Sequence, residues 1–308
     1  MAERPQIAER DQLRADLRAA LGTEVESARA VVADSAKDPA ERVHSARKYL
    51  KRWRALERLL PPQTRRKLWR EARTVRLVSR SLGRVRDPVA QAESWAEFAS
   101  SSALSDGAPA ITQLLDARIA QGAEPGRVQR RLRRAAQLLA RAAARSAELL
   151  AADAHGESRA RSALLRGLRR SYRKARSQLQ AALACPSAEQ LHALRRATKA
   201  HQYQLQFVEP IWKKPLKAQR KQAERVSDQL GTERDLAAIT RLLQTDADAH
   251  PYAWFGLLRH LEQEQAHLAE QAFGIARLLF AERPRAFQER VDNYLRASDR
   301  TQSAVTAE

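Results

Sequence analysis

Two histidines in this chain open strongly basic segments whose spacing suits the binding of an anion. His44 begins HSARKYLKRWR, and His192 begins HALRRATKAHQ. At about 100° per residue, a helix would gather the cationic and hydrogen-bonding side chains of each segment on one face and its apolar side chains on the other. The first face consists of His44, Arg47, Lys48, Lys51 and Arg54, and the second consists of His192, Arg195, Arg196, Lys199 and Tyr203. Either face can donate hydrogen bonds and supply positive charge to phosphate oxygens.

Further basic runs repeat this theme. Between Arg42 and Arg86 the chain has sixteen Lys or Arg residues and two acids, Glu57 and Glu71. Like charges three or four positions apart destabilise a helix by roughly a few tenths of a kcal/mol per pair, so helix stability does not explain the pattern, whereas a bound anion does. The predicted anion-binding residues therefore also include Arg66, Arg70, Arg73, Arg166, Arg170, Arg173, Lys214, Lys217 and Lys221.

The two histidine segments belong to an internal duplication. His192 follows His44 by 148 positions, and the same offset places LGTERD (230–235) on LGRVRD (82–87). A single offset that aligns both motifs indicates a repeated unit. If the two basic faces meet across the halves, they line a groove or a pore.

The final aspartate of each LGxxRD string has two interpretations. Asp87 precedes Pro88 and Asp235 precedes Leu236, an arrangement that favours an N-cap for a following helix. In that case a third helix ends at each motif and a fourth begins there. The alternative is that each aspartate holds a basic side chain of the groove in its binding rotamer.

The elements that must position these residues are predicted to be helices. Ala, Leu, Arg, Glu and Gln dominate the composition, with only 10 Gly and 5% aromatic residues. We therefore predict an all-α fold of two pseudo-symmetric antiparallel halves, each like a four-helix bundle, around a basic central pocket or channel. One domain is expected over residues 8–296, with repeat one at 8–153, repeat two at 157–296, and a disordered tail at 297–308.

Helix boundaries can be placed from capping residues and loops. Asp38 with Pro39, and Ser187 after Pro186, mark the starts of the two histidine helices. A helix over Arg127–Ala152 is expected to close the first copy, and its counterpart is expected from about Trp254 to Phe280.

The formal net charge of +20 calls for a negatively charged partner. No stretch approaches the roughly 20 apolar residues of a membrane span, and the start lacks an apolar signal region, so a soluble cytoplasmic protein without membrane insertion is expected. The single cysteine, Cys185, cannot form an internal disulfide. His260, Glu264 and His267 share a helix face but are too few to predict a metal site. No cofactor is expected.

The two histidine faces and the paired LGxxRD strings resemble the CHAD family, the conserved histidine α-helical domain. The resemblance covers about Ala8 to Arg296. It implies two four-helix bundles around a basic pocket that binds inorganic polyphosphate, and a location on polyphosphate granules. Some relatives also carry a CYTH-type triphosphatase. Here Glu24 and Glu26 match only part of its ExExK signature, because residue 28 is Ala, so no fused triphosphatase is expected.

Three other functions compete with polyphosphate binding. A membrane-surface role of the basic amphipathic helices is one of them, and it is disfavoured because the apolar faces of these helices are expected to lie in the core. Nucleic-acid binding is the main alternative, because phosphate contacts would dominate there too. However, no helix-turn-helix, zinc or RRM signature is present, and most aromatic residues fall on apolar faces, as Trp53 does. An enzyme of polyphosphate metabolism is a weaker alternative, because the basic faces contain neither a Gly-rich phosphate loop nor paired acids. A binding protein rather than an enzyme is therefore expected.

Overall fold

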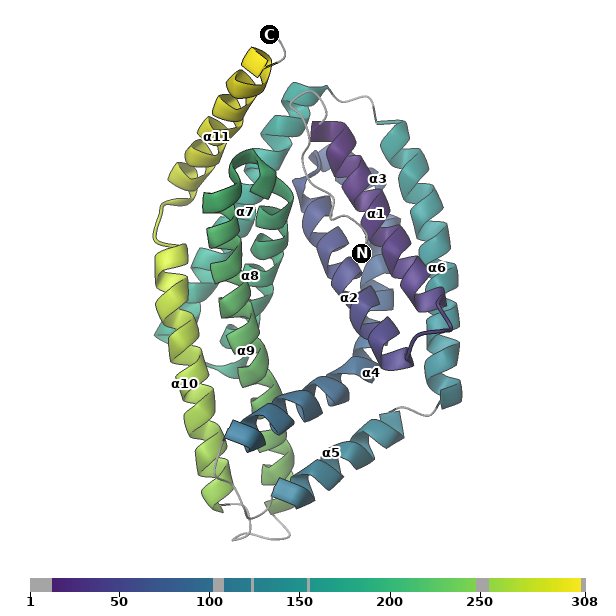
Figure 1. Ribbon diagram of the computed structural model, residues 1–308, viewed down its shortest axis with the longest axis vertical. Coiled ribbons are helices and arrows are strands. Elements are labelled where there is room, and N and C mark those ends of the chain that lie inside the picture. The colour runs from purple at the N-terminus through teal and green to yellow at the C-terminus, as the bar shows by residue number, and fades with distance from the viewer. Residues whose placement is uncertain (1–12, 102–107, 123–124, 154–155, 248–254, 306–308) are drawn as a thin grey trace.

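The computed structural model describes residues 13–101, 108–122, 125–153, 156–247 and 255–305, and every regular element in these ranges is a helix (Figure 1). This confirms the predicted all-α class. The elements are α1 (Leu13–Ala33), α2 (Pro39–Leu56), η2 (Glu57–Leu59), α3 (Pro62–Lys67), α4 (Trp69–Ser101), α5 (Ala108–Gly122), α6 (Pro125–Ala151), α7 (Glu157–Ala184), α8 (Ala188–Val208), η3 (Glu209–Trp212), α9 (Lys213–Ala247), α10 (Phe255–Leu279) and α11 (Pro284–Val305).

Both histidine helices begin at the predicted capping residues. Before α2, the Asp38 carboxylate accepts hydrogen bonds from the backbone N–H groups of Ala40 (2.7 Å) and Glu41 (3.1 Å). Before α8, the Ser187 hydroxyl accepts one from the N–H of Gln190 (3.3 Å). Each cap satisfies donors that the first helical turn leaves unpaired, which fixes where the basic face starts.

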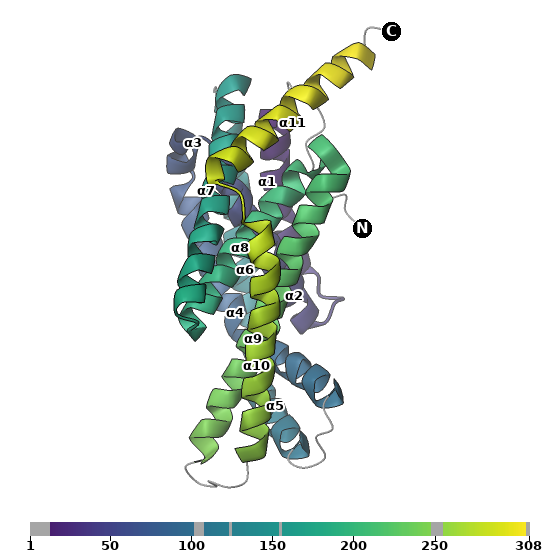
Figure 2. The same cartoon turned by 90° about the vertical axis from the view of Figure 1, so that its left-hand side faces the viewer.

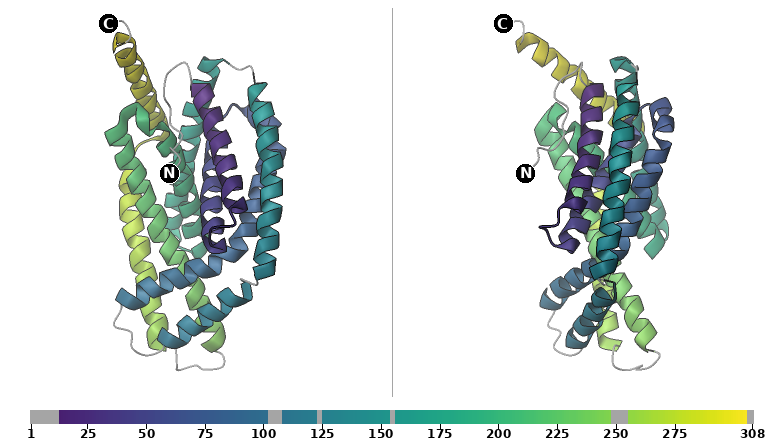
Figure 3. Two further views of the ribbon diagram at one scale, coloured as in Figure 1. Left: turned by 45° about the vertical axis from the view of Figure 1, so that its right-hand side comes forward. Right: turned by 90° about the vertical axis from the view of Figure 1, so that its right-hand side faces the viewer.

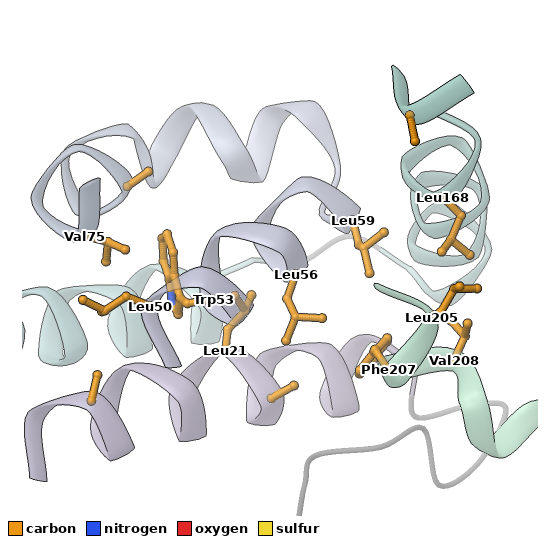
Figure 4. Packing of buried hydrophobic residues seen from close by; sticks show 14 of the residues in the cluster. Leu21, Leu50, Trp53, Leu56, Leu59, Val75, Leu168, Leu205, Phe207 and Val208 are labelled. Carbon is orange, nitrogen blue, oxygen red and sulfur yellow. The ribbon is translucent and has the colours of Figure 1, made fainter. Parts of the chain in front are cut away.

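The two predicted repeats, which we call copy one and copy two, lie side by side and share one hydrophobic core. Helices at equivalent positions in the duplication contact each other, α2 with α8, α4 with α9, and α1 with α7. A single cluster of buried apolar residues includes Leu50 and Leu59 from the first copy and Leu168 and Phe207 from the second (Figure 4). Gly167 permits the close approach of α7 to η2, because a Cβ there would lie 2.9 Å from the carbonyl oxygen of Arg58. The halves are therefore packed together, not linked at a distance.

The structure corrects the predicted break at the LGxxRD strings. Neither Asp87 nor Asp235 caps a helix, because α4 and α9 run without interruption through both motifs, and Pro88 lies inside α4. Proline in a helix interior costs about 3 kcal/mol or more and bends the helix. The bend carries the last turns of α4 across to the second copy (Figure 1).

A second hydrophobic cluster explains why α4 continues past its proline. Beyond the motif, α4 contributes Trp95 and Phe98, each at most 5% exposed, to a cluster with residues of α5, α9 and α10. Burial of two large aromatic side chains stabilises the structure by several kcal/mol, roughly 1.5–3 kcal/mol each, which offsets the proline penalty. The helices after the motifs thus form one small bundle that both copies share.

The closing helices of the two copies differ. Copy one has two helices against α4, which are α5 and then α6, whereas copy two has one long helix, α10, along α9. Helix α11 packs against α7 as α6 packs against α1, so α11 takes the place that was expected for residues 254–280. Helix α11 also continues to Val305 and projects from the body (Figure 2), where a disordered tail was predicted from residue 297. The pair Arg296–Asp292 (2.9 Å), at i and i+4, supports its continuation.

Within the described ranges, no helix combines the length and the apolar character that crossing a membrane would require.

Candidate anion-binding site

The two histidine helices meet at the centre of the molecule and line a common cavity. The Gln204 side-chain amide of α8 donates to the Ala55 carbonyl of α2 (2.8 Å), which ties the helices together at their contact. The cavity has a volume of about 430 Å³ and is lined by α2, α4, α8 and α9. Its walls carry nine Lys and Arg residues and five carboxylates, an excess of four positive charges. We call it the central cavity.

The glycine of each LGxxRD string makes room for an arginine of the neighbouring histidine helix. A Cβ on Gly83 would lie 2.2 Å from Nη1 of Arg47, and one on Gly231 would lie 3.1 Å from Nε of Arg195. The two glycines and the two arginines are each related by the 148-residue offset. Glycine therefore lets each guanidinium lie flat against the next helix, in the wall of the central cavity.

The aspartates of the same strings hold cations. Asp87 accepts a hydrogen bond from Nη2 of Arg47 (3.3 Å), so it pairs with a basic side chain of the cavity wall, as the alternative interpretation of this residue predicts. Asp235 instead accepts from its neighbour Arg234 (2.8 Å), which raises the pKa of that guanidinium against the effect of burial. The other three lining carboxylates are also paired, Glu93 with Arg86, Glu224 with Arg220, and Asp228 with Lys199.

Lys51 and Arg195 line the cavity without pairing with a carboxylate in the described structure, and Arg195 donates to the Ser227 carbonyl (3.1 Å). Lys51 is the more isolated of the two. Among the residues that the structure describes, its ammonium has no hydrogen-bond or ion-pair partner. Burial, together with the positive charges of Arg47, Arg195, Lys199 and Arg234, lowers the pKa of Lys51 to about 7. A buried, unpaired amine that faces four other cations is costly in isolation, and an anion in the cavity would remove that cost.

The second histidine helix adds a tyrosine to the wall. The Lys199 ammonium donates to Asp228 (3.1 Å) and lies 5.8 Å above the centre of the Tyr203 ring. Burial raises the pKa of Tyr203 to about 12, so its hydroxyl stays protonated and can donate to an oxyanion. Only 6% of the residue is exposed, which leaves no open ring face for a base to stack on.

Both histidines are held neutral at physiological pH. Burial first, and then nearby cations, lower the pKa of each imidazole, with Arg86 acting on His44 and Arg234 on His192. The Nε of Arg86 donates to Nδ1 of His44 (3.1 Å), so the proton of the neutral ring is on Nε2, from which it can be donated. The buried Nδ1 of His192 has no hydrogen-bond partner within the described part of the chain.

A second group of cations lies next to the central cavity. The pKa of Arg54 is lowered by burial and by four neighbouring guanidinium groups, which places them together. We call this group the arginine cluster, and it consists of Arg54, Arg58, Arg76, Arg80 and Arg196. His192 has Arg195 and Arg196 as neighbours and so lies between the cavity and the cluster. Arg170 of α7 extends the cluster by donating to the carbonyl of Arg58 (3.1 Å), with Arg166 and Arg173 beside it.

The structure brings together only some of the residues predicted from sequence. Those that line the central cavity are His44, Arg47, Lys48, Lys51, Arg195, Lys199 and Tyr203. Those in or beside the arginine cluster are Arg54, Arg196, His192, Arg166, Arg170 and Arg173. The remaining six do not line the cavity and lie exposed on α3, α4 and α9, and these are Arg66, Arg70, Arg73, Lys214, Lys217 and Lys221.

Sequence reasoning missed several lining cations. Arg86 and Arg234 are the arginines of the two LGxxRD strings, so the shared offset could have identified them. Arg52 and Arg220 gave no such signal, because each lies nine-tenths buried or more and is paired with a glutamate, Glu24 and Glu209 respectively. Their positions follow from packing and not from the basic periodicity.

His201 and the candidate metal ligands take no part in this site. His201 is 1% exposed, its Nδ1 is hydrogen-bonded to the Ser171 hydroxyl (2.9 Å), and burial lowers its pKa to about 3. Among the described residues, no three His, Cys, Asp or Glu side chains are grouped so as to hold a metal ion.

The comparison with protein-family models now identifies the fold. The model of the CHAD domain matches residues 12–244, three quarters of the chain, including both histidine helices and both LGxxRD strings. The chain belongs to the CHAD family. Among solved structures, the crystal structure of the CHAD domain from the plant Ricinus communis is similar, with 18% sequence identity, a TM-score of 0.57, and coverage of 91% of this chain and 95% of that one. No curated protein matches the sequence.

The family match ends before α10 and α11, while the structural similarity extends over nearly the whole chain. The similarity of fold therefore reaches further along the chain than the residues that the family model matches. Identity of 18% supports a shared fold, and the central cavity must be judged from its own residues.

Proposed function

We propose that this CHAD protein binds inorganic polyphosphate in the central cavity. One observation carries the proposal, namely that cations from both histidine helices converge on one cavity whose nine lining Lys and Arg residues outnumber its five carboxylates. Lys51 and Arg195 are left without an ion pair in the described structure, and Lys51 lies where four positive charges surround it. A polymer with about one negative charge per internal phosphate would satisfy these groups together.

A linear polyanion also fits the shape of the charge distribution. From the central cavity the cations continue through His192 to the arginine cluster and on to Arg170. Arginines there can form bidentate hydrogen bonds to phosphate oxygens. A single phosphate would engage a small part of this path, whereas a chain of phosphates would engage all of it.

Polyphosphate is favoured over nucleic acid because the described residues that line the cavity offer no open aromatic ring on which a base could stack. Tyr203 is buried, with the Lys199 ammonium over its ring, so no aromatic platform faces the cavity for stacking. Nucleic acid would gain phosphate contacts only, and its bases would need room that a cavity of about 430 Å³ does not provide.

We also propose that the protein binds polyphosphate without converting it, and that it associates with polyphosphate granules in the cytoplasm. Each lining carboxylate already pairs with a cation, so none is free to bind magnesium or to act as a general base. The charged groups of the cavity are therefore suited to holding a chain in place.

The test is a titration of the full-length protein with long-chain polyphosphate, in competition with duplex and single-stranded nucleic acid, at about 0.05 M and 0.15 M salt. The cavity variant carries Arg47→Ala, Lys51→Ala, Arg195→Ala and Lys199→Ala. A control variant with the same loss of charge carries Lys213→Ala, Lys214→Ala, Lys217→Ala and Lys221→Ala, all exposed on α9.

We expect tight binding that persists at the higher salt under competition, is lost in the cavity variant and is retained by the control. Equal competition by nucleic acid, or equal losses in the two variants, would show that the protein has a generally basic surface instead of a selective site.

A further inference from the structure

A second basic surface lies outside the cavity on the outer side of the first copy. Helices α4 and α6 pack against each other along one long side of the molecule (Figure 3). Their solvent-facing positions, together with the end of α3, form what we call the outer arginine face. It consists of Arg66, Arg70, Arg73, Arg84, Arg133, Arg134 and Arg141, and all seven are exposed.

The arginines of this face are not neutralised by the protein. In the part of the chain that the structure describes, none of the seven forms an ion pair with a carboxylate. Exposed arginines elsewhere do so, for example Arg145 with Glu148 (2.9 Å) and Arg285 with Glu289 (2.9 Å). The acid nearest in sequence on α4, Glu71, is 6% exposed and so does not reach the surface.

Two large apolar side chains are exposed among these arginines. Trp69 is 52% exposed and Leu77 is 50% exposed, and the Arg70 guanidinium lies 5.4 Å from the centre of the Trp69 ring. Eight positions apart on one helix, the two side chains lie on the same side and about 12 Å from each other. An exposed tryptophan and leucine within a cationic surface indicate a partner that is both anionic and able to accept apolar groups.

The second copy does not repeat this surface. Helix α6 contains seven arginines and one acid, whereas α11, which packs against α7 as α6 packs against α1, contains four arginines and three acids. The exposed basic residues in the first turns of α9 are lysines, namely Lys213, Lys214, Lys217 and Lys221. Trp212, which precedes them, is 49% exposed but packs edge-on against Tyr294 with ring centres 4.4 Å apart. The outer arginine face is therefore present in copy one and is not repeated in copy two.

We propose that the outer arginine face docks this protein on the surface of an anionic phospholipid bilayer. A bilayer presents a plane of phosphate and carboxylate groups, which suits two adjacent antiparallel helices whose exposed arginines extend over about 21 Å of α4, from Arg70 to Arg84. Trp69 and Leu77 would enter the headgroup region, where tryptophan is favoured. The apolar sides of α4 and α6 stay in the core, so docking needs no rearrangement of the fold.

A nucleic-acid duplex fits the face less well. Its major groove admits one helix and not a two-helix plane, and an exposed leucine gains nothing from the phosphate backbone. Bilayer docking does not depend on the contents of the central cavity, since the two sets of residues do not overlap.

The experiment is sedimentation of the full-length protein with vesicles of phosphatidylcholine containing phosphatidylserine, and with vesicles of phosphatidylcholine alone. The charge variant carries Arg70→Gln, Arg73→Gln and Arg141→Gln. Its matched control carries Lys214→Gln, Lys217→Gln and Lys221→Gln, with the same change in net charge on α9. A third variant, Trp69→Ser with Leu77→Ser, removes the apolar contacts and keeps every charge. All of these side chains are exposed, so folding is expected to be retained and is checked by thermal melting.

We expect wild-type protein and the control to bind only the vesicles that contain phosphatidylserine. The charge variant should bind them at least about ten-fold more weakly, since each arginine near an anionic surface is worth close to a factor of five. The serine variant should also bind more weakly. Equal losses in the charge variant and its control, or unchanged vesicle binding by the serine variant, would overturn the proposal. Loss of duplex DNA binding without loss of vesicle binding would assign the face to nucleic acid instead.

Discussion

The central cavity and the outer arginine face are both strongly cationic, but they hold their charges in opposite ways. In the cavity, cations are largely buried and most are already paired with carboxylates, as Arg47 is with Asp87. On the outer face the arginines are exposed and pair with no carboxylate in the described structure. Burial makes the cavity sensitive to protonation and to small displacements, whereas the solvated face depends mainly on ionic strength and on the number of charges. Sequence composition alone does not distinguish the two.

Reversing one charge at the centre of the cavity should give the largest difference between polyphosphate binding in the cavity and vesicle binding at the outer arginine face. Lys51→Glu places a carboxylate among Arg47, Arg195 and Lys199, which would pair with it and close the site to phosphate. We expect polyphosphate to bind about 100-fold more weakly or worse, since each charged hydrogen bond lost contributes about 1.5–3 kcal/mol. Isothermal titration calorimetry measures this loss. Vesicle binding should stay at the wild-type level, and a parallel loss there would mean that the regions are not independent.

The dependence on pH should also differ between the regions. Burial lowers the pKa of Lys51 to about 7 and raises that of Glu233, which is also close to Asp235, to about 7. A bound polyanion raises both pKa values, so binding takes up protons and affinity falls as pH rises through this range. Between about pH 6.5 and 8.5 we expect a loss of roughly ten- to thirty-fold, from the fraction of Lys51 that is protonated.

Calorimetry in two buffers of different ionisation enthalpy would count the protons taken up. At about pH 8 the wild-type protein should take up more protons than the Lys51→Gln variant, in which only Glu233, His44 and His192 remain to titrate. The exposed arginines do not titrate in this range, so the affinity for vesicles should not change with pH. If the affinity for polyphosphate does not change with pH, Lys51 is already charged in the free protein.

The sequence predicted the histidine helices well because their signals are local. Asp38 and Ser187 cap α2 and α8 as expected, and the apolar periodicity put Leu50 and Trp53 in the core. The continuation of α4 past Pro88 could not be predicted from local signals. The helix continues because Trp95 and Phe98 pack against α5, α9 and α10, which are distant in the sequence.

The site was predicted in part for the same reason. Residues one or two turns apart on one helix, such as Arg47 and Lys51, were placed on a common face by periodicity alone. Arg66, Arg70 and Arg73 have the same composition and spacing, yet they face solvent, because α4 turns that side away from α8 and α9. Which basic faces converge depends on how the helices pack, and a helical wheel carries no such information.

The glycines of the LGxxRD strings offer a way to weaken the cavity without weakening the fold. In Gly83→Ala the new Cβ would collide with Nη1 of Arg47, so the guanidinium must leave its position beside Asp87. We expect polyphosphate to bind about ten-fold more weakly, because one charged hydrogen bond to the ligand is lost. Thermal stability should be unchanged or higher, because alanine stabilises a helix interior by about 1 kcal/mol relative to glycine.

Gly231→Ala is the matched comparison, and it should have a smaller effect. Its Cβ would lie 3.1 Å from Arg195 instead of the 2.2 Å found at Gly83, so a shift of a few tenths of an ångström suffices. Affinity and melting temperature should be measured together on both variants. A loss of stability in parallel with affinity would show that these glycines serve packing rather than the placement of arginine.

Removing a carboxylate that competes with the ligand is expected to have the smallest effect on polyphosphate affinity. It is also the one change here that should increase that affinity. Asp228 pairs with the Lys199 ammonium (3.1 Å), and its side chain is 63% exposed. An ion pair this exposed contributes between 0 and about 1 kcal/mol, so breaking it costs little stability. In Asp228→Asn, Lys199 is released and the cavity gains one positive charge, which should tighten polyphosphate binding about two- to five-fold at low salt.

This gain in polyphosphate affinity should shrink as salt is added, and vesicle binding should not change. A weaker affinity would mean that Asp228 holds Lys199 in its binding position, as Asp87 holds Arg47, so that the cavity carboxylates orient the cations more than they compete with the ligand.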